Sequence, residues 1–253
     1  MILDTFKLDN KRAIVTGASR GLGRSIAIGL AQAGCDVALV ATSDMTEVAK
    51  QIKTIGPKAV CIQADLMDRK CIPDIITQTK AQLGGIDIVI NNAGIIRRND
   101  LVDFTQDDWD EVMEVNLNSL FFLCQQAAKV MIEQGTGGKI INIASMLSFQ
   151  GGIRVPAYTA SKSAVMGLTR ALANELATHD INVNAIAPGY MATDNTAPLR
   201  ADEKRNKEIL GRIPAGHWGD PEDLQGAVVF LASNAAKYVH GTTLAVDGGW
   251  LAR

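Results

Sequence analysis

The feature that most constrains the fold is an alternation, along almost the whole chain, of short β-branched runs with longer amphipathic stretches. Seven runs have strand character: residues 12–16, 37–41, 59–63, 87–90, 139–143, 181–187 and 243–246. Helical stretches separate them, near residues 22–33, 44–55, 71–82, 107–134, 157–177 and 221–232. Most of the strands are apolar on both faces, which is typical of a parallel sheet covered by helices. The pattern predicts an α/β fold, with one doubly wound domain spanning residues 1–253.

One segment departs from the alternation. Residues 188–216 form a long polar connection after the sixth predicted strand, with a short helical patch around 202–211. Connections of this length in compact domains are usually functional or disordered. Because ligands bind at the carboxyl ends of the strands in open α/β sheets, we expect this segment to be a substrate lid.

Composition excludes several classes of protein. The formal net charge of the chain is -2, without the excess of basic residues that nucleic-acid binding requires. No apolar run is long enough to cross a bilayer, and charges interrupt the N-terminal residues where a signal peptide would have its apolar core. The four cysteines and three histidines have no metal-ligand spacing. We therefore expect a cytoplasmic protein without a metal, a membrane partner or a nucleic-acid partner.

A glycine-rich turn follows the first predicted strand. Residues 16–23 read TGASRGLG, so that Gly17, Gly21 and Gly23 precede a predicted helix with G-x-x-x-G-x-G spacing. This spacing differs from the G-x-G-x-x-G fingerprint, but the physical reason for the glycines is similar. They allow a tight turn and a close approach to a pyrophosphate, which a helix N-terminus attracts. The turn indicates a dinucleotide site.

Two further fragments lie where such a cofactor would pass. Asp65, after the third predicted strand, could accept a hydrogen bond from the adenine amino group, and residues 91–94 (NNAG), after the fourth, could support the ribose. Each fragment alone is also explained by ordinary turn chemistry. Their position at successive strand ends favours the cofactor interpretation.

The end of the second predicted strand bears on the choice between NAD(H) and NADP(H). An acidic residue there would bind the adenosine 2′-hydroxyl, whereas a basic neighbour would accommodate a 2′-phosphate. The most favourable acidic position holds Ala41, while Arg20 and Thr42 could contact a phosphate. These residues favour NADP(H), although Asp44 is still within reach of a ribose.

Four residues suggest carbonyl chemistry. Tyr158 and Lys162 form a Y-x-x-x-K pair on one face of a predicted helix. A phenol has a pKa of about 10, and a nearby ammonium lowers it towards the pH range of general acid–base catalysis. Ser145, after the fifth strand, could offer its hydroxyl to a carbonyl oxygen. Asn116 lies in an apolar helical stretch and is either a hydrogen-bonded core amide or part of a proton relay behind Lys162.

Together these motifs resemble the short-chain dehydrogenase/reductase family. The glycine-rich turn, NNAG, Asn116, Ser145, Y-x-x-x-K and Pro188-Gly189 occur in the order and spacing of that family, over essentially the whole chain. The resemblance implies a Rossmann-like domain with a seven-stranded sheet, hydride transfer at a nicotinamide, a homotetramer, and a catalytic tetrad of Ser145, Tyr158, Lys162 and Asn116. The cofactor contacts that we expect are Gly17, Ser19, Arg20, Gly21, Leu22, Gly23, Thr42, Ser43, Asp65, Leu66, Asn92, Ala93, Gly94, Val115, Tyr158, Lys162, Pro188 and Gly189.

A narrower resemblance concerns the substrate. The stretches SMLSFQGGIRVPAYTASK and IAPGYMATDNT are similar to members of the family that interconvert 2,5-diketo-3-deoxygluconate and 2-keto-3-deoxygluconate in uronate breakdown, usually with NAD(H). An acidic sugar needs a cation, and Arg97, Arg98 and Arg154 flank the catalytic motifs. The substrate contacts that we expect are Arg97, Met146, Arg154 and Tyr190.

Two alternatives stay open. The cofactor turn looks more like that of 3-oxoacyl-carrier-protein reductases, which use NADPH. A carrier protein would need a basic docking patch beside the pocket, and we expect no pronounced cluster there. A non-catalytic dinucleotide-binding protein is the other alternative, although such a protein has no physical need for a paired tyrosine and lysine beside a positioned serine.

Overall fold

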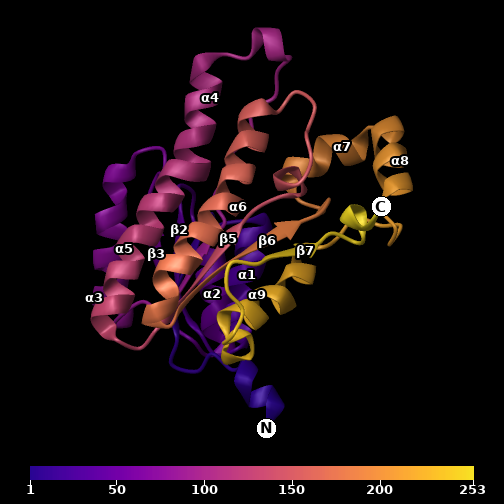
Figure 1. Ribbon diagram of the computed structural model, residues 1–253. Helices are drawn as coiled ribbons and strands as arrows, with labels where there is room; N and C mark the ends of the chain where they lie inside the picture. Colours follow the sequence, from indigo (N-terminus) through magenta and orange to yellow (C-terminus); the bar gives the residue numbers. More distant parts are fainter.

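Seven parallel strands form one sheet in this computed structural model, which describes residues 1–253 (Figure 1). The strands are β1 (Arg12–Thr16), β2 (Asp36–Ala41), β3 (Ala59–Gln63), β4 (Ile88–Asn91), β5 (Gly138–Ile143), β6 (Ile181–Pro188) and β7 (Thr243–Val246). Their spatial order is β3-β2-β1-β4-β5-β6-β7, and every neighbouring pair is parallel. The predicted doubly wound sheet is confirmed, and each predicted strand boundary lies within one residue of the observed one.

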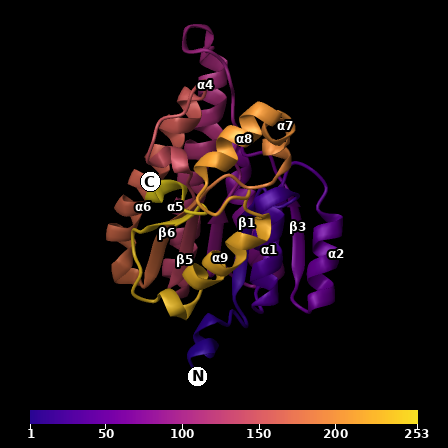
Figure 2. The same cartoon turned by 90° about the vertical axis from the view of Figure 1, so that its right-hand side faces the viewer.

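Helices cover both faces of this sheet (Figures 1 and 2). They are α1 (Gly21–Gln32), α2 (Thr46–Ile55), α3 (Ile72–Leu83), α4 (Gln106–Met113), α5 (Ser119–Gln134), α6 (Pro156–Leu176), α7 (Ala197–Ala201), α8 (Glu203–Arg212) and α9 (Gln225–Ala232). Alternate residues of one strand enter different cores: Leu39 belongs to the cluster that includes residues of α1, α2 and α9, whereas Val40 belongs to the cluster that includes residues of α3, α5 and α6. The strands must therefore be apolar on both faces.

The helical stretch predicted over residues 107–134 is confirmed, because Gln106–Gln134 is helical without a break, but the change of helix type inside it was not predicted. A π-helical turn, Glu114–Asn118, separates α4 from α5, with the fully buried Asn116 at its centre. An apolar pattern cannot reveal such a turn, because the inserted residue is held by contacts that are distant in sequence. The predicted helix at 221–232 likewise begins as a 3₁₀ turn, Pro221–Leu224, before α9, and the short helix α7 was not predicted.

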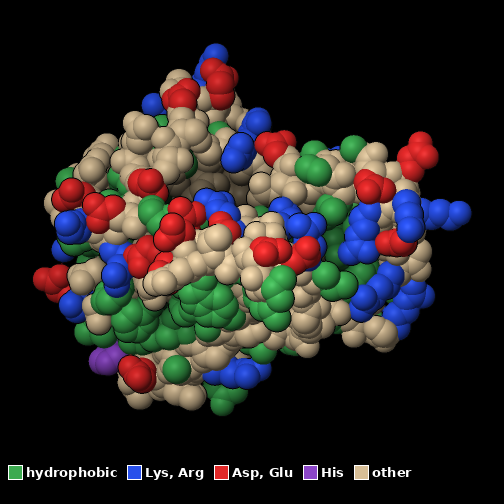
Figure 3. All heavy atoms as spheres, turned by 90° about the horizontal axis from the view of Figure 1, so that it is seen from above, with side chains coloured by type: hydrophobic (Ala, Val, Ile, Leu, Met, Phe, Trp, Pro, Cys, Tyr) green, Lys and Arg blue, Asp and Glu red, His purple; other side chains and the backbone are tan.

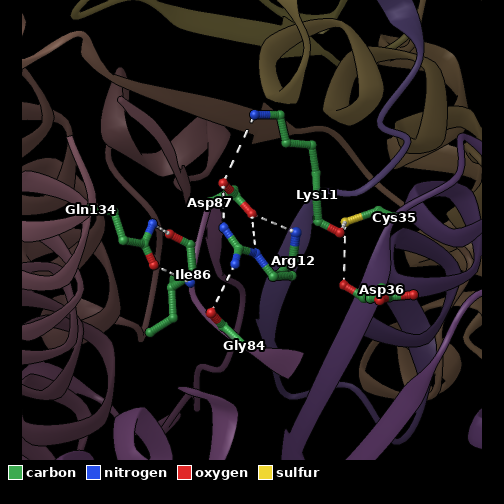
Figure 4. A network of polar contacts seen from close by, with 8 residues as sticks. All are labelled: Lys11, Arg12, Cys35, Asp36, Gly84, Ile86, Asp87 and Gln134. Atoms are coloured by element: carbon green, nitrogen blue, oxygen red, sulfur yellow. Dashed lines mark hydrogen bonds and ion pairs between the residues drawn. The ribbon is translucent and has the colours of Figure 1, made fainter. Parts of the chain in front are cut away.

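A polar network closes the amino end of the sheet (Figure 4). Arg12 Nε donates to Asp87 Oδ2 at 2.6 Å and Arg12 Nη2 donates to Asp87 Oδ1 at 3.1 Å. Lys11 Nζ lies 3.9 Å from the same carboxylate. The Gln134 amide accepts from the Ile86 N–H at 2.9 Å and donates to its carbonyl at 2.8 Å. These contacts tie β1, the start of β4 and the end of α5 together.

The opposite, carboxyl end carries α7 and α8, which lie in the connection between β6 and α9. Figure 3 looks down on this end and shows a hollow between the α4 side of the molecule and the α7–α8 side, with Lys and Arg side chains at its edge. No helix has the length and apolar character that spanning a membrane would demand.

Candidate active site

The glycine-rich turn brings bare backbone to the carboxyl end of β1. Gly17 and Gly21 have φ values of 65° and 53°, in the left-handed region that glycine adopts without strain. A Cβ atom on Gly23 would lie only 2.1 Å from the Gly17 carbonyl oxygen, so no larger residue fits there. α1 begins at Gly21 and directs its free N–H groups to this turn. The arrangement can hold a pyrophosphate.

The NNAG motif fixes this turn from the neighbouring strand. Thr16 Oγ1 accepts from the backbone N–H groups of Asn92 and Ala93, each at 3.0 Å. The Asn92 amide in turn donates to the Thr16 carbonyl at 2.9 Å. The two motifs that the sequence analysis assigned to the cofactor are therefore joined directly, although 76 residues separate Thr16 from Asn92.

The surroundings of the β2 end carry hydroxyls and no available carboxylate. Ser43 Oγ donates to Ser19 Oγ at 2.8 Å, and Arg20 is exposed beside them in sequence. Asp44 Oδ1 accepts from both the N–H and the hydroxyl of Thr46, at 3.1 and 2.6 Å. These bonds lower the pKa of the Asp44 carboxyl and hold it at the start of α2. They weaken the alternative in which Asp44 binds a ribose.

The remaining adenine-side candidates lie at the carboxyl end of β3. Asp65 is exposed and accepts a hydrogen bond from the Met67 N–H at 2.9 Å, which shapes the turn. Leu66 is buried, and its carbonyl accepts from the Ser119 hydroxyl at 2.6 Å. Val115 is also buried. Because β3 lies beside β2, this turn is at the same edge of the sheet as the glycine-rich turn.

Ser145, Tyr158 and Lys162 converge on the same end of the sheet. Ser145 follows β5, whereas Tyr158 and Lys162 lie one turn apart on α6. The Ser145 side chain lies close enough to Tyr158 to lower the pKa of its phenol. The Lys162 ammonium lies 5.7 Å from the centre of the Tyr158 ring and donates to the Ile143 carbonyl at 2.6 Å. The structure thus brings together three of the four predicted catalytic residues.

Burial shifts the pKa values of Lys162 and Tyr158 in opposite directions. It lowers the pKa of Lys162 to about 8, and no carboxylate counteracts the effect. It raises the pKa of Tyr158, while the nearby Ser145 side chain and the positive charge of Arg98 act in the opposite direction. A phenol and an amine with shifted pKa values, in contact at a strand end, are typical of acid–base chemistry.

The fourth predicted residue, Asn116, is committed to the backbone. Its Oδ1 accepts from the Ile95 N–H at 2.8 Å, and its Nδ2 donates to the Ile95 carbonyl at 3.0 Å and to Ser161 Oγ at 3.2 Å. A Cβ on Gly94 would lie 3.2 Å from Asn116 Oδ1 and 3.7 Å from Lys162 Nζ. The Asn116 side chain therefore anchors the loop after β4 close to Lys162 through the peptide group of Ile95.

Two predicted substrate contacts, Arg97 and Arg154, are paired with carboxylates. Arg97 Nη2 lies 2.6 Å from Glu111 Oε2, and Arg97 Nε lies 3.6 Å from Asp108 Oδ1. Arg154 Nε lies 2.9 Å from Asp100 Oδ1. Both arginines are thus engaged by carboxylates of α4 or of the loop before it. These partners depend on the fold of α4 and the loop before it, which sequence spacing did not reveal.

Arg98 stands apart from its neighbours. Its side chain is exposed and forms no ion pair, and it lies close enough to Tyr158 for its charge to lower that phenol's pKa. From the sequence we expected Arg97, and not Arg98, to contact the substrate. The acidic start of α4 could have distinguished the two arginines, because it provides carboxylate partners for Arg97 and none for Arg98.

The other substrate candidates, Met146 and Tyr190, differ in their surroundings. Met146 is buried and is the first residue of the turn that follows Ser145. Tyr190 packs in a cluster of aromatic rings, with centroid distances of 5.4 Å to Trp218 and 4.8 Å to Trp250. Gly189 follows β6, where a Cβ would lie 2.6 Å from the Asp247 Cα, so the chain leaves Pro188 in close contact with the β7 end.

The chain beyond this cluster crosses the mouth of the site. A Cβ on Gly21 would lie 3.7 Å from Thr193 Cγ2, so the start of the connection faces the glycine-rich turn. Further on, Ile209 of α8 is buried, and the Arg212 guanidinium lies 4.0 Å above the Trp250 ring. α7 contains no buried residue. The connection is thus anchored at α8 and exposed at α7.

Comparisons with known proteins agree with this geometry. Residues 17–251 match the model of a family described as enoyl-(acyl carrier protein) reductase. The chain is 60% identical over 253 residues to the 2-dehydro-3-deoxy-D-gluconate 5-dehydrogenase of Escherichia coli (strain K12), covering 100% of both chains. It is 40% identical over 243 residues to a 3-oxoacyl-[acyl-carrier-protein] reductase of Staphylococcus epidermidis, covering 95% of this chain and 98% of that protein.

A solved structure supports the same relationship. The gluconate 5-dehydrogenase of Burkholderia cenocepacia J2315, in complex with NADP and tartrate, superposes with a TM-score of 0.95 at 38% sequence identity. The match covers 100% of this chain and 100% of that one.

Proposed function

The chain belongs to the short-chain dehydrogenase/reductase family, and from that premise we propose that it is an NAD(P)(H)-dependent oxidoreductase of a keto-deoxy sugar acid. The reaction that we assign interconverts 2,5-diketo-3-deoxygluconate and 2-keto-3-deoxygluconate in uronate catabolism. The observation that carries the proposal is the contact of Ser145, Tyr158 and Lys162 at the strand end beside the glycine-rich turn. The identity with the E. coli 5-dehydrogenase supports the choice of substrate.

The residues present fit a dinucleotide. A Cβ on Gly23 would collide with the Gly17 carbonyl oxygen, so only glycine allows the tight turn that brings backbone N–H groups to the start of α1, where a pyrophosphate would be held. The bound cofactor supplies or accepts the hydride at its nicotinamide. In the reductive direction the Ser145 hydroxyl holds the substrate's carbonyl oxygen, and the Tyr158 hydroxyl delivers a proton to that oxygen. Lys162 stabilises the phenolate that forms and orients the ribose. Asn116 maintains the loop against which Lys162 lies.

Arg98 is the side chain that we propose for the substrate carboxylate. Its charge acts on the catalytic tyrosine, and it has no carboxylate of its own, unlike Arg97 and Arg154. A charge-assisted bond of this kind contributes about 1.5–3 kcal/mol, so Arg98→Met should raise KM for the sugar acid about 10- to 100-fold. Arg97→Met is the matched control, and a larger effect there would reverse the assignment.

For the cofactor we propose a preference for NADP(H). Ser19, Arg20 and Ser43 can surround a 2′-phosphate, and the Asp44 carboxylate is held by Thr46. Arg20→Ala should raise KM for NADPH by about 10-fold and leave KM for NADH nearly unchanged. Equal losses with both cofactors would contradict the preference.

Three further features belong to the proposal. Residues 188–216 act as a substrate lid on the single domain 1–253, and the exposed α7 is the part that moves. Family resemblance supports a homotetramer that works in the cytoplasm.

A 3-oxoacyl-carrier-protein reductase is the second candidate, because α8 carries four exposed basic residues, Lys204, Arg205, Lys207 and Arg212. They are interspersed with Glu203 and Glu208, and Arg205 is paired with Glu208, so the expectation of no pronounced basic cluster stays a prediction. The deciding experiment measures initial rates with NADH and NADPH against 2,5-diketo-3-deoxygluconate and against an acetoacetyl thioester. Turnover of the thioester alone would overturn the sugar-acid assignment. Absence of turnover with any keto compound would favour a non-catalytic dinucleotide-binding protein.

A further inference from the structure

The catalytic hydroxyls come from two separate segments of the chain. Ser145 lies on the turn after β5, and Tyr158 lies on α6. Both must reach the same carbonyl oxygen, and a misplacement of about 1 Å can cost about 100-fold in rate. Something must therefore fix the turn after Ser145 against α6.

One buried hydroxyl makes that connection. Ser148 ends the 3₁₀ turn Met146–Ser148, and its side chain is 7% exposed. Its Oγ donates to the backbone carbonyl of Lys162 at 2.6 Å and accepts from the backbone N–H of Ser145 at 3.3 Å. A single side chain thus contacts the main chain of two catalytic residues.

The same turn also orients the Ser145 side chain. Ser145 Oγ accepts from the Leu147 N–H at 3.1 Å, which leaves the hydroxyl directed towards Tyr158. The other polar side-chain link between this turn and α6 is weaker. Ser163 Oγ donates to the Leu147 carbonyl at 3.4 Å, from an exposed position. Ser148 is consequently the buried link, and Ser163 is its natural control.

We infer that Ser148 is a positioning residue that fixes the Ser145 hydroxyl relative to Tyr158. The inference rests on the proposed function and deepens it. Ser148 itself touches no reacting atom and acts through Ser145. Without its hydroxyl, the Ser145 N–H loses this acceptor and the turn loses its buried hydrogen bond to α6.

A measurable consequence concerns Tyr158. The nearby Ser145 side chain lowers the pKa of the Tyr158 phenol against the effect of burial. In Ser148→Ala the Ser145 hydroxyl is held less closely to Tyr158, so the pKa of Tyr158 rises. In the oxidative direction Tyr158 must accept a proton, and the rising limb of kcat against pH therefore moves to higher pH. A purely structural role for Ser148 would lower thermal stability without moving this limb.

The experiment compares full-length Ser148→Ala, Ser148→Thr and Ser163→Ala with the wild type. We expect Ser148→Ala to lower kcat about 10- to 100-fold, with the cofactor Kd and the substrate KM within about twofold of the wild type. Ser148→Thr, which keeps the hydroxyl, should recover most of the loss, and Ser163→Ala should behave as the wild type. An unchanged kcat in Ser148→Ala would overturn the inference.

A double-mutant cycle tests whether Ser148 influences kcat through Ser145. If Ser148 acts through Ser145, then adding Ser148→Ala to Ser145→Ala costs little more activity. Fully multiplicative losses would show an independent role and contradict the inference.

An ultraviolet titration of the phenol, with Tyr158→Phe protein as the baseline, gives the pKa of Tyr158 without turnover. This measurement tests Ser148 even if the wild type reduces neither keto compound, an outcome that would refute only the proposed function. An identical pKa in the wild type and Ser148→Ala would refute the positioning role.

Discussion

At one end of the sheet a buried charge has a partner of opposite charge, and at the other end it has none. At the amino end, the Asp87 carboxylate receives the Arg12 side chain and the Arg12 backbone N–H (Figure 4). At the carboxyl end, Lys162 is equally buried and has only the Ile143 carbonyl as a partner. Removing one partner of a buried ion pair is strongly destabilising, whereas a buried charge without a partner has a displaced pKa and is available for chemistry. The comparison indicates that stability and reactivity are concentrated at opposite ends of the same strands.

Lys139 shows that a shifted pKa alone does not mark a functional residue. Burial lowers its pKa to about 8, as it does for Lys162. Its ammonium donates to the Asn182 amide oxygen at 2.7 Å, near the amino end of the sheet. An amide cannot exchange a proton at neutral pH, whereas the Tyr158 phenol beside Lys162 can. The neighbour therefore decides what a displaced pKa can do.

The largest expected effect is on activity at the carboxyl end. Tyr158→Phe removes the proton donor and keeps the ring, so turnover should fall by about 1,000-fold or more. The cofactor Kd and the free energy of unfolding should stay close to those of the wild type. Steady-state rates and a cofactor titration check this, and near-wild-type activity in the variant would refute the catalytic assignment.

The next effect is on stability at the amino end. Asp87→Ala leaves the Arg12 guanidinium half-buried without its partner, and we expect the free energy of unfolding to fall by about 3 kcal/mol. The kcat of the folded fraction should not change, because Asp87 lies at the far end of the sheet. Urea denaturation measures the loss. The double variant Arg12→Met/Asp87→Ala should recover part of it, and no recovery would contradict the pairing.

A smaller effect should have the opposite sign. The pKa of Lys162 is lowered from 10.5 to about 8 in the folded protein, so the unfolded chain binds the proton more tightly. The wild type therefore gains stability as pH rises from about 8 to 10.5, and carries a cost below that window. Lys162→Met should be inactive but more stable at pH 7 by about 1 kcal/mol, an advantage that shrinks above pH 8.

The matched control for that variant is the exposed Lys204→Met on α8. Thermal or urea unfolding at pH 7 and pH 10 compares the two substitutions with the wild type. A Lys162→Met advantage that is equal at both pH values would show that packing, and not the buried charge, explains it.

The smallest expected effect distinguishes the contribution of Lys11 to the Asp87 network from that of Arg12. Lys11 Nζ lies 3.9 Å from the carboxylate, and its side chain is 41% exposed. Such a pair contributes little, so Lys11→Ala should change the free energy of unfolding by less than about 0.5 kcal/mol, with a dependence on salt. A loss comparable to that of Asp87→Ala would mean that Lys11, rather than Arg12, holds the network.

Features with a local cause could be predicted from the sequence. Period and length located all seven strands, and the glycine spacing located the turn where Gly23 admits no Cβ. Features fixed by partners distant in the chain could not. The π-helical turn at Asn116 depends on the Ile95 peptide group, and the pairing of Arg97 depends on Glu111. Asp44 is an intermediate case, since a carboxylate two residues before Thr46 is a local helix-start signal that was open to two interpretations.

The strand order also relates the parts of the site to the order in which the chain is synthesised. The first three strands form one side of the sheet, and each later strand then adds to the single free edge that β1, β4, β5 and β6 expose in turn. A ribosome that adds about 5–20 residues per second has therefore made both Thr16 and Asn92 several seconds before it makes Lys162. The chain is synthesised with its nucleotide-holding half first, its acid–base group second and its lid third.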